Sequence, residues 1–318
     1  MPIPQATREE TLPPLEEPMR PAAGGRAVVR LLRPKQWTKN LLVFAALIFS
    51  GHFRDPQAIG LAVLAFAAMS LVSSATYAFN DVADVARDRQ HPRKRNRPIA
   101  SGAISPRVGT AIGIVLLLIG VGIAAALNTT SVALIAAYLL LQMAYNVGLK
   151  KTPVADVYCI ATGFVLRAVL GAAAISVSIS GWLLFCTGAL ALMLGFGKRR
   201  NEFILQGDAR AASRESLVSY NRLALDGMVV MFATAAALCF GVYSLESATA
   251  QRFPGIILTA PFVFYGITRY VLLIFTLDEG GEPADVLFRD RHLVFSILAF
   301  LAAAILAMSG LRLPFLES

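Results

Sequence analysis

The chain has 318 residues, of which 56% are apolar and only 15% are charged, a composition that excludes an ordinary soluble domain. It predicts an all-α integral membrane protein, and the net charge of +9 comes from cations in short segments between apolar runs. That distribution favours contact with a lipid bilayer or with anionic substrates, and it argues against nucleic acid as a partner. The three cysteines lie far apart within apolar segments, so neither a disulfide framework nor a zinc site is expected.

The N-terminal region divides into two parts. Residues 1–25 contain six prolines and little apolar periodicity, which predicts a disordered cytoplasmic tail. From Arg26 to Asn40, cations alternate with Val, Leu and Trp37, a pattern typical of an interfacial helix that leads into a first membrane span. We expect residues 26–318 to form a single membrane domain.

Nine apolar segments follow, and the first is short for a bilayer unless the preceding residues extend it. They cover residues 41–53, 57–79, 107–127, 130–147, 154–176, 180–197, 222–244, 254–276 and 292–312. Of the 29 Lys and Arg residues, 25 fall on the N-terminal side of the predicted bundle. By the positive-inside rule, the N-terminus and the large polar loops are cytoplasmic, and the C-terminus lies outside the plasma membrane.

The segment NDVADVARDRQH, which begins at Asn80, follows the second apolar run. On a helix, Asp81, Asp84 and Asp88 share one stripe, roughly 100° wide, with Asn80 and His91. Three carboxylates on one face repel one another, and a divalent cation would offset that repulsion. Mg²⁺ shares carboxylates with substrate phosphates, so the pattern predicts these aspartates as catalytic ligands of Mg²⁺ for a phosphorylated substrate. A solvated polar helix end is the structural alternative.

A basic segment comes directly after this acidic stripe, from His91 to Arg97. Arg binds phosphate oxygens with a planar fork and Lys binds them as a point charge, so Lys94 and Arg97 are candidate phosphate ligands. A basic run beside a membrane is also a topology signal or a lipid-headgroup site, and these interpretations can hold together.

A second polar face is predicted in the segment 154–176, where Asp156 and Arg167 lie on one side of a helix. Arg167 would lie about 16 Å deeper than Asp156. A buried arginine at that depth indicates either a functional site or a structural ion pair with Asp156. Tyr145 and Lys150 lie just before this segment, at the membrane edge, where substrate contact and simple anchoring both fit the sequence.

After the sixth apolar run, the sequence GFGKRRNEF places Lys198 and Arg199 at the mouth of a span. These cations are suited to bind a second phosphate group, and they equally fit a topology signal. The acidic loop 278–290 fits either a flexible lid or a solvated turn.

The order of these motifs resembles the signature of the UbiA superfamily of intramembrane prenyltransferases. The pattern N-D-x-x-D-x-x-x-D runs from Asn80 to Asp88, and R-P-x-A-x-G follows from Arg97 to Gly102. The resemblance implies a UbiA-type bundle of nine transmembrane helices over residues 30–312, with active-site loops on the cytoplasmic side.

Within this superfamily, the chain departs from the aromatic prenyltransferases, which carry a second D-x-x-x-D motif after the sixth span. Here Glu202, Asp208 and Glu215 have a different spacing and stand among cations. The stretches LRPKQWTKNLLVFAALIFSG, DVYCIATGFVLRAVLGA and GFGKRRNE instead resemble the decaprenyl-phosphate phosphoribosyltransferase branch. That branch implies 5-phosphoribosyl 1-diphosphate as donor and a polyprenyl phosphate as acceptor. Diphosphate would be released, and the product would supply cell-wall arabinan synthesis.

This resemblance suggests roles for the predicted residues. Asp81, Asp84 and Asp88 would hold Mg²⁺ against the donor's diphosphate, and the anionic lipid phosphate would attack without a strong general base. The candidate ligands of the acceptor phosphate are Lys35, Lys39 and Arg167, and those of the donor are Lys94, Arg97, Lys198 and Arg199. Asn80, His91, Tyr145, Lys150 and Asp156 complete the predicted substrate-binding set.

Two other functions stay open at this point. An aromatic or haem-type prenyltransferase would use the same acidic stripe with a polyprenyl diphosphate, although the basic segment at Lys198 argues against it. A transporter or lipid-binding protein would use the stripe as an ion site, although transport sites usually lie near the membrane midplane. The sequence leaves the polyprenyl chain length and the formation of homo-oligomers undetermined.

Overall fold

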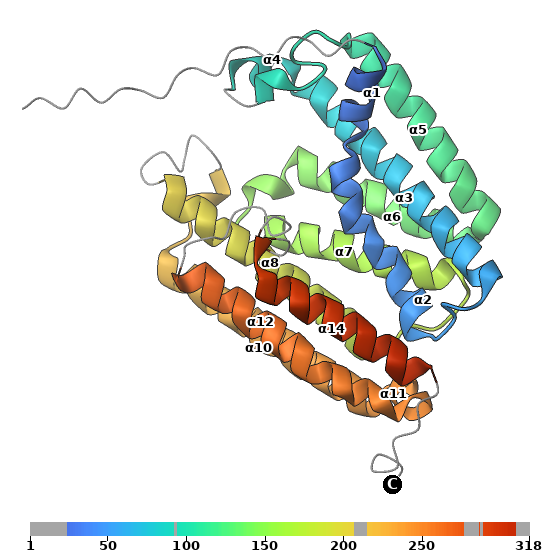
Figure 1. Cartoon of the computed structure of the whole chain (residues 1–318). Coiled ribbons are helices and arrows are strands. Elements are labelled where there is room, and N and C mark those ends of the chain that lie inside the picture. Colours follow the sequence, from blue (N-terminus) through green and yellow to red (C-terminus); the bar gives the residue numbers. More distant parts are fainter. Residues whose placement is uncertain (1–23, 92–93, 207–214, 277–285, 287–288, 310–318) are drawn as a thin grey trace, which may run out of the picture.

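The computed structural model describes residues 24–91, 94–206, 215–276, 286 and 289–309 of the chain. All regular elements in these residues are helices, and they pack as a bundle (Figure 1). The predicted all-α fold is therefore confirmed. The predicted disordered tail lies almost entirely outside the described residues, as does most of the acidic loop 278–290.

Eight helices in the described residues are long and apolar enough to cross a membrane. They are α3 (Pro56–Ala83), α5 (Pro106–Leu127), α6 (Thr129–Val147), α7 (Ala155–Ala174), α8 (Gly181–Gln206), α10 (Arg222–Glu246), the continuous pair of η6 (Pro254–Thr259) and α12 (Ala260–Thr276), and α14 (Arg291–Met308). Each overlaps one predicted apolar segment, and α8 continues beyond the predicted end at residue 197. The chain is therefore a multi-pass membrane protein.

Most of these helices begin at a capping side chain. Asp55, Ser105, Asn128, Asn221 and Asp290 each accept a hydrogen bond from a backbone N–H in the first turn of α3, α5, α6, α10 and α14. Such a cap stabilises a helix by roughly 0.5–2 kcal/mol. These residues fix where the long helices start after short connections.

The first predicted span, residues 41–53, has a different structure from the other eight. It begins within the 3₁₀-helix η1 (Pro34–Phe44), which continues into the short α-helix α2 (Ala45–Phe49). This helical run does not belong to the eight long helices of the described chain, so the ninth span stays a prediction.

The prediction of one interfacial helix from Arg26 to Asn40 is wrong, because the structure has two helices there, α1 (Gly25–Leu32) and η1. α1 ends at Arg33, whose φ of 53° lies in the left-handed region. Pro34 explains the break, because a proline disfavours the helical conformation of the residue before it. The break separates a short basic helix from η1, which packs along α3 and α7.

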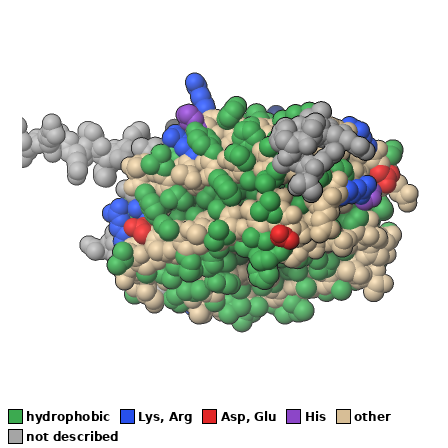
Figure 2. All heavy atoms as spheres, turned by 90° about the horizontal axis from the view of Figure 1, so that it is seen from below, with side chains coloured by type: hydrophobic (Ala, Val, Ile, Leu, Met, Phe, Trp, Pro, Cys, Tyr) green, Lys and Arg blue, Asp and Glu red, His purple; other side chains and the backbone are tan. Residues whose placement is uncertain are grey.

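The acidic stripe lies at one end of the bundle. Figure 1 places α1 and α4 (Val85–Gln90) at that end, and α2 and α11 (Ala248–Arg252) at the other. In Figure 2, hydrophobic side chains cover much of the visible face, and most charged side chains gather toward its edges. An apolar belt with polar ends is the arrangement that a bilayer requires.

Close packing of η1 on α7 depends on Gly171, where a Cβ would lie 1.8 Å from the carbonyl oxygen of Val43. We expect Gly171→Ala to push η1 away from α7 and to lower the free energy of unfolding by about 1–3 kcal/mol or more. Gly122→Ala in α5 is the matched control, because nothing lies within 4 Å of its Cβ position. Thermal unfolding in detergent measures both variants, and equal midpoints would contradict this packing.

Candidate active site

The acidic stripe lies where α3 ends and α4 begins. Asp84 stands between the two helices with φ −93° and ψ 7°, outside the helical region, and the Asp88 N–H donates to its carbonyl at 2.8 Å. Asp81 and Asp88 nevertheless come to the same side, because one nitrogen of Arg97 contacts both of them. The helix ends at Gln90, and His91 is extended (φ −90°, ψ 130°) because it precedes a proline. The predicted continuation of the helix through His91 is wrong.

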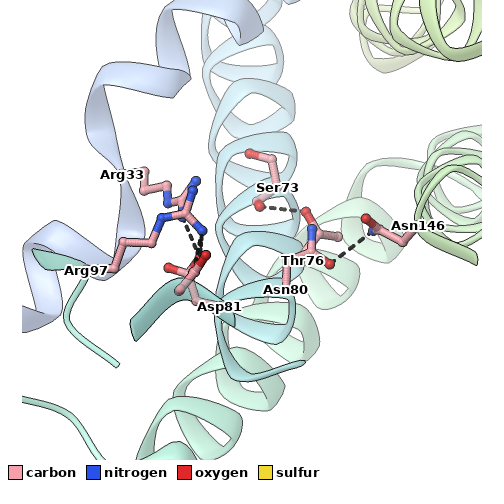
Figure 3. A network of polar contacts seen from close by, with 8 residues as sticks. Arg33, Ser73, Thr76, Asn80, Asp81, Arg97 and Asn146 are labelled. Atoms are coloured by element: carbon pink, nitrogen blue, oxygen red, sulfur yellow. Dashed lines mark hydrogen bonds and ion pairs between the residues drawn. The ribbon is translucent and has the colours of Figure 1, made fainter. Parts of the chain in front are cut away.

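Two arginines neutralise these carboxylates, and Figure 3 shows both arginines beside Asp81. Arg97 Nη1 lies 3.0 Å from Asp81 Oδ1 and 2.7 Å from Asp88 Oδ2. Arg33 Nη2 lies 2.6 Å from the same Asp81 oxygen. Both aspartates are only 2% exposed, so these ion pairs are screened less than pairs on a surface. The second oxygen of Asp81, Oδ2, is buried without a hydrogen-bond partner.

The other members of the stripe have different surroundings. Asn80 points away from Asp81 toward α6, where its Oδ1 accepts a hydrogen bond from Asn146 Nδ2 at 3.0 Å (Figure 3). Asp84 is half-buried, and within the described chain no ion pair joins it to either arginine. No three His, Cys, Asp or Glu side chains of the described residues form a group able to hold a metal ion.

Asp81 and Asp88 nevertheless fit a divalent cation held by two carboxylates. One oxygen of each aspartate contacts the same nitrogen, Arg97 Nη1. Asp81 Oδ2 is a further buried oxygen that can serve as a metal ligand. Mg²⁺ binds through one or two carboxylates and completes its coordination with water and substrate phosphates. The geometry suits these two aspartates for the predicted metal better than it suits Asp84.

A cationic pocket of about 620 Å³ opens beside these carboxylates, between α1, η1 and the end of α3. Its charged lining residues are Arg30, Arg33, Lys35 and Arg97 together with Asp81. Four cations around one carboxylate leave a net positive charge. Such a pocket suits a ligand that carries more than one phosphate group.

The sequence-based prediction missed Arg30 and Arg33, which fell within the predicted interfacial helix. Arg30 Nη2 donates to the carbonyl oxygen of Asn96 at 3.1 Å, which ties α1 to the opposite wall of the pocket. The Arg33 guanidinium lies 4.9 Å from the centre of the Tyr77 ring, a cation–π contact. The Arg33-Pro34 dipeptide was the available signal, since a proline inside a helical pattern marks its end.

A second charged cluster lies in the last turns of α8. Arg199 is 1% exposed, and its Nε lies 2.8 Å from Asp156 Oδ2 on α7. Its Nη1 lies 2.5 Å from Glu202 Oε2. The neighbouring Arg200, also 1% exposed, lies 2.5 Å from Asp226 on α10. The structure thus brings the predicted residues Asp156 and Arg199 together as a buried ion pair, and their contact with substrate stays a prediction.

Arg167 is buried among helices and binds neutral groups. Its Nε donates to Asn40 Oδ1 at 2.7 Å, and its Nη1 donates to the Gly163 carbonyl at 2.6 Å. Its Nη2 donates to the Tyr138 hydroxyl at 3.2 Å. The ion pair with Asp156 that the sequence allowed is not formed, because Asp156 binds Arg199 instead. The contacts of Arg167 tie α7 to η1 and α6.

The remaining predicted residues are not gathered at one place. Lys35 and His91 are exposed, and the half-buried residues are Lys39, Lys94, Tyr145, Lys150 and Lys198. Among these described residues, Lys35 alone lines the cationic pocket. The structure therefore groups two of the predicted phosphate ligands, Lys35 and Arg97, with Asp81.

A separate apolar cavity of about 350 Å³ lies between η1, α2, α8, α10, α12 and α14. Its lining includes the rings of Phe49, Phe240 and Phe300 and few polar groups. A cavity of this kind suits a hydrocarbon chain rather than a polar ligand.

Comparison with known proteins places this architecture in a family. The UbiA prenyltransferase family model matches residues 41–289. The chain belongs to the UbiA prenyltransferase family. It is 34% identical over 281 residues to the decaprenyl-phosphate phosphoribosyltransferase of Mycobacterium tuberculosis, and the aligned region covers 86% of this chain and 92% of that protein. It is also 34% identical over 289 residues to the decaprenyl-phosphate phosphoribosyltransferase of Corynebacterium glutamicum, with 88% and 86% covered.

A solved structure shows the same UbiA fold. A UbiA homologue from Archaeoglobus fulgidus bound to GPP and Mg²⁺ matches with a TM-score of 0.67 and 19% sequence identity. The match covers 89% of this chain and 99% of that chain. The predicted UbiA-type helical bundle is therefore confirmed, while the count of nine spans and the side of the loops stay predictions.

The buried pair of Arg199 and Asp156 predicts a specific pattern of stability. Arg199→Met leaves Asp156 buried without this partner and should lower the free energy of unfolding by about 3–5 kcal/mol. The double variant Arg199→Met/Asp156→Leu should recover much of that loss, because replacing a whole buried ion pair by apolar groups is often close to neutral. Denaturant titration in mixed micelles gives the comparison. A double variant no more stable than Arg199→Met would contradict a mainly structural role for the pair.

Proposed function

We propose that this chain transfers 5-phosphoribose from 5-phosphoribosyl 1-diphosphate to a polyprenyl phosphate, such as decaprenyl phosphate, and releases diphosphate. The cationic pocket beside Asp81 is the observation on which the proposal rests, because four cations around a buried carboxylate suit a donor with two phosphorylated positions. The two relatives named decaprenyl-phosphate phosphoribosyltransferases support the same donor and acceptor.

On the donor side, Asp81 and Asp88 would hold Mg²⁺, with Asp84 as the third member of the predicted set. When bound there, the ion would stabilise the negative charge of the diphosphate as it leaves the anomeric carbon. Arg33 and Lys35 face the same pocket and bind phosphate oxygens of the donor. Lys35, a candidate for the acceptor phosphate from the sequence, is reassigned to the donor because it lines the pocket of Asp81. Together these residues orient the anomeric carbon toward the incoming lipid phosphate.

On the acceptor side, η1 contributes to both the cationic pocket and the apolar cavity. Lys35 lines the cationic pocket and Leu42 lines the apolar cavity, roughly 14 Å apart along a 3₁₀-helix. The first isoprene units of the polyprenyl tail occupy the apolar cavity, and the lipid phosphate reaches the donor along η1. Its oxygen forms the new bond to the anomeric carbon while the bond to diphosphate breaks. That oxygen is already anionic, so the reaction needs no strong general base.

We infer that the protein lies in the plasma membrane with its N-terminus and active site on the cytoplasmic side. The support is the distribution of cations, 25 of 29 on one side of the predicted spans. The C-terminus would then lie outside. The lipid product would serve as a precursor for cell-wall arabinan.

Membranes that contain the chain should move label from radiolabelled 5-phosphoribosyl 1-diphosphate into lipid when decaprenyl phosphate and Mg²⁺ are present. Asp81→Asn should lower this rate by at least about a hundredfold, because it removes a charged oxygen ligand next to the reacting diphosphate. Organic extraction followed by scintillation counting measures the transfer. Product from a polyprenyl diphosphate and 4-hydroxybenzoate, with none from the phosphoribosyl donor, would identify an aromatic prenyltransferase instead. No product from either pair would favour a transporter or lipid-binding role.

The cationic pocket also predicts that a substitution at Lys35 weakens donor binding. Lys35→Gln should raise the KM for 5-phosphoribosyl 1-diphosphate about tenfold, with a smaller effect on kcat, because it removes one charge-assisted contact to phosphate. Arg54→Gln is the matched control, since Arg54 is exposed and lies in the connection between α2 and α3. Steady-state kinetics with a varied donor concentration provides both values. An unchanged KM in Lys35→Gln would remove Lys35 from the donor site.

A further inference from the structure

Arg97 is the one residue of the described chain that bridges the two buried aspartates. A single nitrogen, Nη1, contacts Asp81 Oδ1 at 3.0 Å and Asp88 Oδ2 at 2.7 Å. The two aspartates are 2% exposed, whereas the Arg97 side chain is 29% exposed and lines the cationic pocket. Arg97 therefore stands between the buried carboxylates and the space where an anionic ligand would enter.

We propose that Arg97 is a resident counter-ion that occupies the metal position in the empty protein and transfers to the diphosphate when the metal binds. Arg97 is then a positioning residue that couples metal binding to donor binding. The transfer to diphosphate rests on the proposed function, whereas the competition with metal rests on the Asp81 and Asp88 contacts alone.

Electrostatics explains why the two carboxylates need such a counter-ion when no metal lies between them. Two buried carboxylates that face one point repel each other strongly in a poorly polar environment, and a cation between them offsets this repulsion. A divalent metal would do the same with twice the charge and shorter contacts. Because Arg97 Nη1 already lies within hydrogen-bond distance of both oxygens, a metal that binds both must displace it.

The groups around Arg97 favour its replacement by a metal ion. Asp81 Oδ2 is buried without a hydrogen-bond partner, so the site holds an oxygen that Arg97 does not use and that suits a metal. Arg33 contacts Asp81 Oδ1 at 2.6 Å and can keep part of the negative charge neutralised while Arg97 moves. Arg97 also lines the cationic pocket, where its guanidinium can bind phosphate oxygens of a ligand.

The exchange makes binding of metal and diphosphate mutually dependent. Metal alone must compete with Arg97, so it should bind weakly. Diphosphate accepts the displaced guanidinium and should tighten metal binding, and by linkage the metal tightens diphosphate binding by the same factor. Direct contact between the metal and diphosphate also couples their binding, so the contribution of Arg97 is the part of the coupling that Arg97→Gln loses.

Metal binding to the purified full chain, without the transfer reaction, tests the proposal. We expect Arg97→Gln to bind Mn²⁺ at least tenfold more tightly than the wild type by electron paramagnetic resonance of free Mn²⁺, and to melt at a lower temperature in EDTA. After subtraction of the Mn²⁺ that diphosphate binds without protein, diphosphate should tighten Mn²⁺ binding to the wild type about tenfold and to Arg97→Gln much less. Arg95→Gln is the matched control, because Arg95 is exposed in the same segment and its loss changes the net charge equally. Unchanged or weaker Mn²⁺ binding in Arg97→Gln would overturn the proposal.

A second measurement on the wild type does not depend on the folding of a variant. Phenylglyoxal modifies accessible guanidinium groups, and mass spectrometry reports the modified fraction of Arg97. Mn²⁺ alone should raise this fraction by releasing Arg97 from the aspartates, and Mn²⁺ with diphosphate should lower it again. A modified fraction that Mn²⁺ leaves unchanged would contradict the displacement. Because both experiments use diphosphate rather than the phosphoribosyl donor, they can succeed even if the proposed transfer reaction fails.

Discussion

The site depends on two carboxylates that the fold buries and on the arginines that neutralise them. Asp81 and Asp88 are held at 2% exposure where α3 passes into α4, and burial of charge at this level is unfavourable without partners. Arg97 bridges them, and Arg33 reaches Asp81 from the left-handed break after α1. These ion pairs therefore join three segments of the chain: the end of α3, the segment after α4 and the end of α1.

The other helices hold this network of ion pairs at one end of the bundle, next to its apolar surface. η1 packs so closely on α7 that Gly171 leaves no room for a side chain, and Arg167 ties the same two elements to α6 through Asn40 and Tyr138. A polar donor and a lipid acceptor could thus approach from two environments and meet along η1, which lines both spaces.

Helical periodicity predicted that Asp81 and Asp88 share a side, because the two residues are close in sequence and the helices α3 and α4 are interrupted only at Asp84. The same stripe misplaced Asn80, whose partner Asn146 lies on α6 and is invisible to periodicity. Eight of the apolar segments were likewise confirmed as long helices by their length and composition. The ion pairs of Arg33 and Arg199 could not be predicted for one shared reason: their partners come from distant parts of the chain. Sequence alone could not show that Arg199 already binds a buried carboxylate.

An experimental structure of the full chain with Mg²⁺ and diphosphate bound tests the central claim most directly. The predicted result is diphosphate in the cationic pocket beside Arg33 and Lys35, Mg²⁺ on Asp81 and Asp88, and the Arg97 guanidinium on a phosphate oxygen. Diphosphate bound elsewhere would contradict the assignment of this pocket as the donor site, whatever reaction the protein performs. Mg²⁺ bound while Arg97 still bridges both aspartates would contradict the exchange.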